Sequence, residues 1–159
     1  MRIRTLLFTA LVAGWAFPAL AQTPAILDAL SGTYRTRLVY EDLAAQGFHQ
    51  PYDLVGTWTV SIRPDGHVEW HYDLPSGPGP SSYDMSSVYV VHGDRLYVGA
   101  DTGAYPCQDL YGVTSGVYAW SWTDDEALDL TVIDDACPER RIILTAKPLV
   151  PVDEAPASD

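Results

Sequence analysis

The sequence contains no asparagine, one lysine (Lys147) and only two cysteines among its 159 residues. Acidic side chains outnumber basic ones by 21 to 9, which gives a formal net charge of −12 at pH 7. Such a surface repels phosphate backbones and anionic membranes, so nucleic acid and anionic lipid are disfavoured as partners. The chain also lacks a glycine-rich phosphate loop and a G-x-S-x-G motif, and nothing in it indicates nucleotide or serine-hydrolase chemistry.

The N-terminus carries the pattern of a secretory signal peptide. Residues 1–4 are basic, residues 6–16 are apolar, and Ala19-Leu-Ala21 matches a small-residue cleavage site. The apolar run is too short to anchor the chain stably across a bilayer. We therefore expect a periplasmic or secreted protein, not membrane-spanning, that is cleaved near Ala21. The remaining 138 residues suffice for one domain with a core of its own.

The two cysteines, Cys107 and Cys137, favour a disulfide, because an even number of cysteines in an exported chain usually pairs. The bridge would close a loop of about 30 residues and stabilise the fold by roughly 3–4 kcal/mol on the chain-entropy model. A metal site would need two more soft ligands nearby, and none are adjacent. The disulfide leaves no free thiol as a nucleophile.

Alternation of apolar and polar residues predicts a mainly β protein. The expected strands are 32–40, 56–63, 67–72, 85–91, 95–99, 117–122, 127–133 and 142–146. The last three read as a meander, and residues 41–46, stopped by Gly47, read as a short helix after the first strand. Eight strands joined mostly by hairpins predict an antiparallel up-and-down sheet that closes into a barrel, because closure removes exposed edges. A two-sheet sandwich is the alternative.

This pattern divides the chain into four parts. Residues 1–21 are the signal peptide, 22–29 a lead-in, and 30–148 the barrel. Residues 149–159 are rich in proline and acids, and we expect them to be a disordered tail.

Several short motifs follow one another along the chain: Leu30-Ser-Gly-Thr-Tyr34, Glu41-Asp-Leu-Ala-Ala45, Leu54-Val-Gly-Thr-Trp58, Pro64-Asp-Gly66, Gly93-Asp-Arg-Leu96, Gly116-Val-Tyr-Ala-Trp120 and Asp135-Ala-Cys-Pro-Glu-Arg140. In this order they resemble the lipocalin-like (calycin-like) barrels of exported bacterial proteins. The resemblance spans residues 30–148 and implies a small barrel with interior space for an apolar ligand. It also implies that Trp58, the Gly-x-Trp tryptophan, is covered at the closed end by Arg140 or Arg141.

Strand periodicity places a set of aromatic side chains on the inward faces. The candidate ligand-lining residues are Trp58, Trp70, Tyr118, Trp120 and Trp122. An aromatic lining suits planar or hydrophobic ligands. The alternative is plain core packing, because small eight-stranded barrels can be filled by their own side chains.

Two further groups of polar residues merit attention. His67, Glu69 and His71 alternate along one strand and could bind zinc, but the opposite face is apolar and we expect these three to be solvated. At the closed end of the barrel, Asp134 or Asp135 is expected to pair with Arg140 or Arg141 beside the disulfide.

Taken together, the sequence predicts a non-enzymatic extracytoplasmic barrel without a cofactor that binds a small apolar ligand. The alternative is a filled barrel that serves as an adaptor or inhibitor. An enzyme with a barrel-borne site is a more distant alternative, since no catalytic motif supports it.

Overall fold

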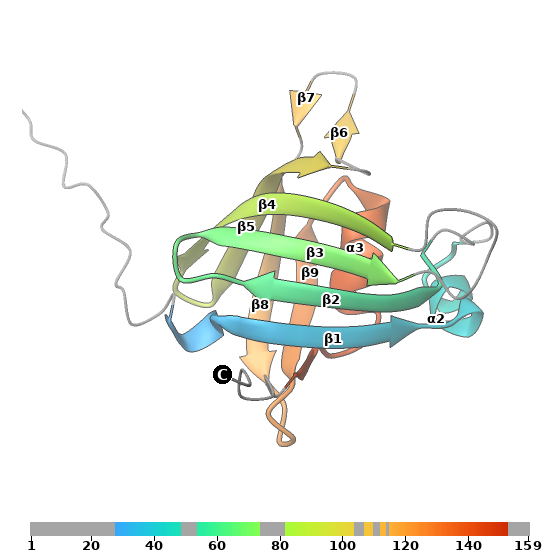
Figure 1. Cartoon of the computed structure of the whole chain (residues 1–159), viewed down its shortest axis with the longest axis horizontal. Coiled ribbons are helices and arrows are strands. Elements are labelled where there is room, and N and C mark those ends of the chain that lie inside the picture. Colours follow the sequence, from blue (N-terminus) through green and yellow to red (C-terminus); the bar gives the residue numbers. More distant parts are fainter. Residues whose placement is uncertain are drawn as a thin grey trace, which may run out of the picture.

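The structure, a computed structural model, describes residues 28–48, 54–73, 82–103, 107–109, 112–113 and 115–152. The expected signal peptide, most of the lead-in and residues 153–159 of the expected tail lie outside these ranges. The described part is mainly β, with one eight-stranded antiparallel sheet that curls into a nearly closed barrel (Figure 1). The predicted all-β barrel is therefore confirmed, and the two-sheet sandwich is not adopted.

The strands of the sheet follow one another around the barrel in the order β10-β1-β2-β3-β4-β5-β8-β9. Their bounds are β1 (Gly32–Leu38), β2 (Gly56–Ile62), β3 (His67–Asp73), β4 (Ser82–His92), β5 (Arg95–Gly103), β8 (Gly116–Trp122), β9 (Leu128–Asp134) and β10 (Val150–Pro151). The tight turns before β3 and β5 contain Gly66 (φ 88°) and Gly93 (φ 61°), where the left-handed backbone favours glycine. The short helix α2 (Tyr40–Ala45) follows β1, as predicted.

The barrel is closed by a segment that the sequence did not suggest. Tyr34 and Arg35 of β1 pair with Pro151 and Val150 of β10, while Leu149 forms a two-way backbone bridge with Leu128 of β9. The prediction of a disordered tail is therefore wrong for residues 149–151. Pro151 is tolerated in the ladder because β10 is two residues long and lies at the end of the sheet.

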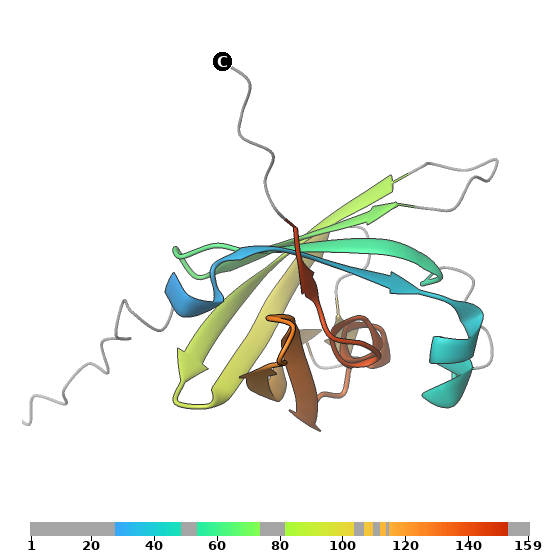
Figure 2. The same ribbon diagram turned by 90° about the horizontal axis from the view of Figure 1, so that it is seen from below.

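The predicted strand 142–146 is wrong, because this segment belongs to the helix α3 (Pro138–Thr145). Pro138 occupies the first turn, where its missing N–H costs nothing, and the Sγ atom of Cys137 accepts a hydrogen bond from the Arg140 amide at 3.4 Å. Ile142, Ile143 and Leu144 are all buried. The helix lies on the inner side of the curved sheet, beside β9 (Figure 2).

The predicted loop 101–115 contains more regular structure than expected. Strand β5 continues to Gly103, and β6 (Gln108–Asp109) and β7 (Gly112–Val113) form a separate two-stranded sheet. The predicted disulfide is confirmed: Cys107 and Cys137 are bonded, with their Cα atoms 5.6 Å apart. The disulfide links the segment that contains β6 and β7 to the start of α3.

Large aromatic and aliphatic side chains are buried inside the barrel. The ring of Trp58 stacks on Tyr72 with a centroid distance of 4.4 Å, and its Nε1 donates to the Leu54 carbonyl at 3.0 Å. Tyr118 is fully buried on β8, and Leu128 and Leu130 are buried on β9, as their alternation predicts. Ile142 and Leu144 of α3 join the same hydrophobic cluster.

Candidate functional site

A buried arginine lies between two aspartates where α3 meets the barrel wall. Arg140 forms a bidentate pair with Asp135: its Nε donates to Oδ2 and its Nη2 to Oδ1, both at 2.8 Å. Its Nη1 also donates to Oδ2 of Asp101, on β5, at 2.5 Å. The side chain of Arg140 is only 3% exposed, and both carboxylates are buried. The predicted ion pair is therefore realised by Asp135 and Arg140, whereas Asp134 is exposed at the end of β9.

The network extends from this arginine into the barrel wall. Ser87 of β4 donates to Oδ1 of Asp101 at 2.5 Å, and Nε1 of Trp70 on β3 donates to the Ser87 hydroxyl at 2.9 Å. On the other side, the Tyr118 hydroxyl donates to Oδ2 of Asp135. Side chains from β3, β4, β5 and β8 are thus connected to α3 by one chain of hydrogen bonds.

Protonation states follow from these contacts. Burial alone would raise the pKa of the Asp135 carboxyl, but hydrogen bonds from Arg140, Tyr118 and the Cys137 amide, together with the Arg140 charge, hold that pKa below its usual range. Burial and the Asp135 carboxylate raise the pKa of the Tyr118 phenol, so Tyr118 stays a neutral donor. Burial lowers the pKa of Arg140, but the two aspartates more than offset this and raise it overall.

The backbone makes room for this arrangement at Gly116, the first residue of β8. A Cβ atom there would collide with the Asp135 carboxylate and with the ring of Tyr118. Every charged member of the network is buried, and the network connects α3 to the barrel wall.

The sequence pointed to only part of this network. Asp101 falls in what was predicted as a loop, and Ser87 is a small polar residue at an inward position of a predicted strand. The register between β4 and β5 shifts at this point, because Ser86 pairs with Thr102 and Val88 with Gly99, so that β5 has one extra residue. This irregularity sets which residue of β5 lies opposite Ser87, and strand alternation alone does not place it. The only feature of the sequence that could have indicated this part of the network was the polar Ser87 at an inward position.

The five candidate lining residues differ in burial. Trp58, Trp70 and Tyr118 are buried and held by internal hydrogen bonds. Trp120 is partly buried against the core, and Trp122 is 42% exposed, 6.3 Å from the ring of Tyr34. Trp122 is the register partner of the buried Leu128, so it lies on the inward face of β8, as predicted. It is exposed there because β8 runs past its pairing with β5, which begins at Arg95 opposite Ala119.

The three residues considered for zinc have separate partners on the outer face of the sheet. Oε1 of Glu69 pairs with Nη1 of Arg63 at 2.9 Å, and Nδ1 of His67 lies 3.2 Å from Oδ1 of Asp65. His71 contacts Asp84 through Nδ1 at 2.7 Å. Within the described ranges, no group of three or more histidine, cysteine or acidic side chains could hold a metal ion.

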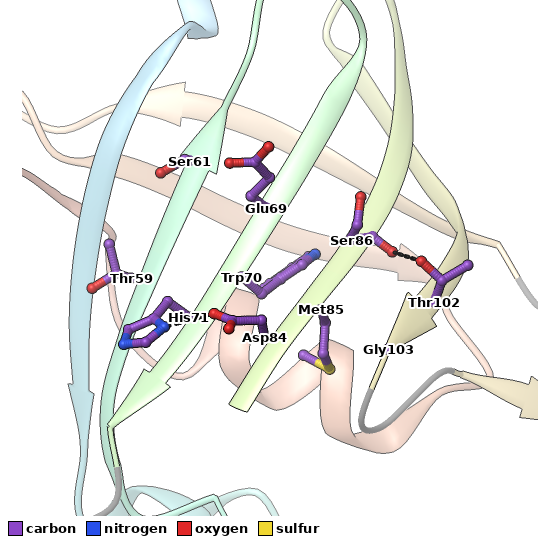
Figure 3. Close-up of a pocket in the computed structure, with 10 residues that line it drawn as sticks. All are labelled: Thr59, Ser61, Glu69, Trp70, His71, Asp84, Met85, Ser86, Thr102 and Gly103. Carbon is purple, nitrogen blue, oxygen red and sulfur yellow. Dashed lines mark hydrogen bonds and ion pairs between the residues drawn. The ribbon is translucent and has the colours of Figure 1, made fainter. Parts of the chain in front are cut away.

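The same outer face carries a trough of about 440 Å³ across β2, β3, β4 and β5 (Figure 3). Its side chains are mainly hydroxyls and carboxylates, with one imidazole. The lining residues are Thr59, Ser61, Glu69, Trp70, His71, Asp84, Met85, Ser86, Thr102 and Gly103. The indole of Trp70 turns inward to Ser87, so this residue contributes its backbone to the trough rather than its ring.

The arginine-covered tryptophan implied by the lipocalin resemblance stays a prediction. The contacts described for Trp58 are with Tyr72 and Leu54, while Arg140 is engaged by Asp101 and Asp135.

The fold and the site define a nearly closed, disulfide-bonded β-barrel with a helix packed beside β9. Comparisons with protein-family models, curated proteins and solved structures found no match to this chain. None of the helices in the described ranges is both long and apolar enough to cross a bilayer.

Proposed function

We propose that the protein is a non-enzymatic, extracytoplasmic, lipocalin-like barrel, filled by its own side chains, that acts through its outer surface as an adaptor or inhibitor. The observation that carries this proposal is the Asp101–Arg140–Asp135 network. A charged group held by two carboxylates inside the barrel takes space that an apolar ligand would need, and its burial is tolerated only while it stays paired.

Two further observations support the proposal. The aromatic groups best suited to line a cavity, Trp58, Trp70 and Tyr118, already use their polar atoms in internal hydrogen bonds. The disulfide between Cys107 and Cys137 and the basic-apolar N-terminus both suit an oxidising, extracytoplasmic compartment.

Native mass spectrometry of protein purified from its own host tests this function. We expect the mass of the mature chain without a bound small molecule, and no tryptophan quenching by palmitate or retinol. A retained apolar ligand in stoichiometric amount would contradict the filled-barrel proposal.

A second candidate function, an apolar ligand held near Trp120, is favoured by a specific observation. Nε1 of Trp120 and Oγ1 of Thr36 are buried and make no hydrogen bond in the described part of the chain. A buried donor without a partner costs about 1–3 kcal/mol, which a ligand with a carbonyl or ether oxygen would recover. If native mass spectrometry detects a ligand, its loss in Trp120→Phe would support this second function.

A further inference from the structure

The outward side chains of the trough form two rows across the strands. One row is Thr59–His71–Asp84, in which each residue is the register partner of the next. The other row is Ser61–Glu69–Ser86–Thr102, again formed by direct register partners. Neighbouring strands lie about 4.8 Å apart, so a ligand a few atoms wide can contact side chains from two or three strands.

We propose that this trough binds a neutral polyhydroxyl ligand, a saccharide. The proposal rests on the proposed function, because it names a ligand class for the outer surface of a filled barrel. The four hydroxyls in the trough each donate one hydrogen bond and accept two, and the carboxylates accept several, which matches the hydroxyls of a sugar.

The hydroxyl groups of the trough can form hydrogen bonds beyond those they make within the described part of the protein. Those of Thr59 and Ser86 make no hydrogen bond within the described residues, and the Thr102 hydroxyl reaches only the Ser86 carbonyl, at 3.4 Å (Figure 3). Ser61 shares a 3.3 Å contact with Thr33 on β1. These groups lie on rigid strands, so a ligand that bonds to them costs little ordering of the protein.

The charges in the trough favour a neutral ligand over an ion. Each carboxylate already has a cationic or imidazole partner: Arg63 for Glu69 at 2.9 Å, and His71 for Asp84 at 2.7 Å. A cation would compete with these partners for the carboxylate oxygens, while an anion would approach a chain of net charge −12. A sugar hydroxyl can donate to the remaining lone pairs of both carboxylates without breaking either pair.

At one end of the trough, the backbone of β5 packs closely against β4, and Gly103 places no side chain above the floor. Gly103 lies so close to β4 that a Cβ atom would come within 2.6 Å of the Asp84 carbonyl oxygen and 2.9 Å of the Met85 Cα. Its φ of 109° is also one that residues with side chains rarely adopt. Without a side chain at Gly103, the floor formed by the backbones of Trp70 and Met85 stays accessible from this end.

A backbone-amide NMR titration of the full mature protein tests the proposal, with maltotetraose, cellotetraose and chitotetraose as probes and spermidine as the cationic comparison. We expect at least one saccharide to shift amides of β2 to β5 around the trough. The double variant Thr59→Ala/Ser86→Ala should weaken that binding by about tenfold. The matched control Ser121→Ala/Thr131→Ala removes two exposed hydroxyls from β8 and β9 and should bind like the wild type.

The remaining outcomes separate this inference from the proposed function. Absence of saccharide shifts, shifts confined to other strands, or a response to spermidine alone would overturn the saccharide assignment and leave the filled barrel intact. A ligand retained inside the barrel in native mass spectrometry would instead overturn the filled barrel. The wild-type titration decides the location even if a variant proves unstable.

Discussion

At the scale of single residues, the ion pairs of Arg140 are the interactions whose loss we expect to destabilise their surroundings most. It is the one cation between two buried aspartates, and the three groups together carry a formal charge of −1 in a dry environment. Removing one partner from such a cluster is far more costly than removing the whole cluster, because it leaves uncompensated buried charge.

We therefore expect Arg140→Met to lower the free energy of unfolding by about 3–5 kcal/mol, since methionine fills the volume but leaves Asp101 and Asp135 unpaired. Arg141→Met is the matched control: Arg141 is the next residue of α3 but lies outside the network, and its substitution should cost less than about 1 kcal/mol. Urea unfolding followed by tryptophan fluorescence measures both. Equal midpoints for the two variants would show that the network contributes little.

The pH dependence of stability reports the charge state of Asp135. Its pKa is depressed in the folded protein, so its contribution is present above the unfolded pKa of about 3.9 and is lost as the pH falls through the lower folded value. We expect the wild type to lose stability progressively as the pH falls below about 4. Arg140→Met should instead gain stability relative to the wild type in acid, because protonation relieves its unpaired carboxylates. Parallel pH profiles of the two proteins would contradict this assignment.

At the scale of secondary-structure elements, the sequence predicted the long strands well and the barrel's closure poorly. Buried and exposed residues alternate regularly along β1 to β3, and Pro64-Asp-Gly66 can reasonably be interpreted only as a hairpin turn. The Ile142-Ile-Leu144 segment is rich in β-branched residues and reads as a strand by local preference. Tertiary contacts decide otherwise, since all three side chains are buried together and Arg140 is bound by distant aspartates.

The candidate site was predictable only where its members are close in the sequence. Asp135 and Arg140 are five residues apart across one turn, so their pairing could be inferred. Asp101 is 39 residues from Arg140, and its contact depends on the extra residue of β5 opposite Ser87 and on the helical state of α3. Neither feature leaves a periodic signal in the sequence.

The closing strand β10 yields a prediction about a pair of adjacent residues. Leu149 is fully buried and bridges to Leu128, whereas Val150 is 56% exposed. We expect Leu149→Ala to cost about 2–5 kcal/mol, because it empties a closed core position. Val150→Ala should cost less than about 0.5 kcal/mol. If thermal unfolding shows equal losses, the segment does not close the barrel in solution.

The disulfide ties β6 and β7 to the N-terminus of α3. Cys107→Ser opens the 30-residue loop while it leaves Cys137 in place to cap the helix. We expect a loss of roughly 3–4 kcal/mol on the chain-entropy model. Wild-type protein under reducing conditions should lose a similar amount, and reductant should not change the stability of Cys107→Ser further. An additional loss in the variant would point to a cause other than the bridge.

At the scale of the whole molecule, the interior and the exterior have opposite characters. The interior side of the sheet carries apolar and aromatic groups and the Asp101–Arg140–Asp135 network, while the trough on the outer face of β2 to β5 is lined mainly with hydroxyls and carboxylates. If the barrel is filled as we propose, recognition takes place on the outer surface. The charge on that surface therefore affects both its stability and its choice of partner.

The net charge of −12 leads to a prediction for the molecule as a whole. Acidic groups repel one another more in the compact state than in the expanded one, so added salt should stabilise the fold by screening. The screening length falls to about 10 Å at 0.1 M and about 3 Å at 1 M, so most of the gain should come at low salt. We expect the unfolding temperature to rise by a few degrees and then level off. Sodium chloride and choline chloride should act equally, because screening depends on ionic strength rather than on ion identity. A rise with sodium alone would indicate a bound cation and contradict general screening as its cause.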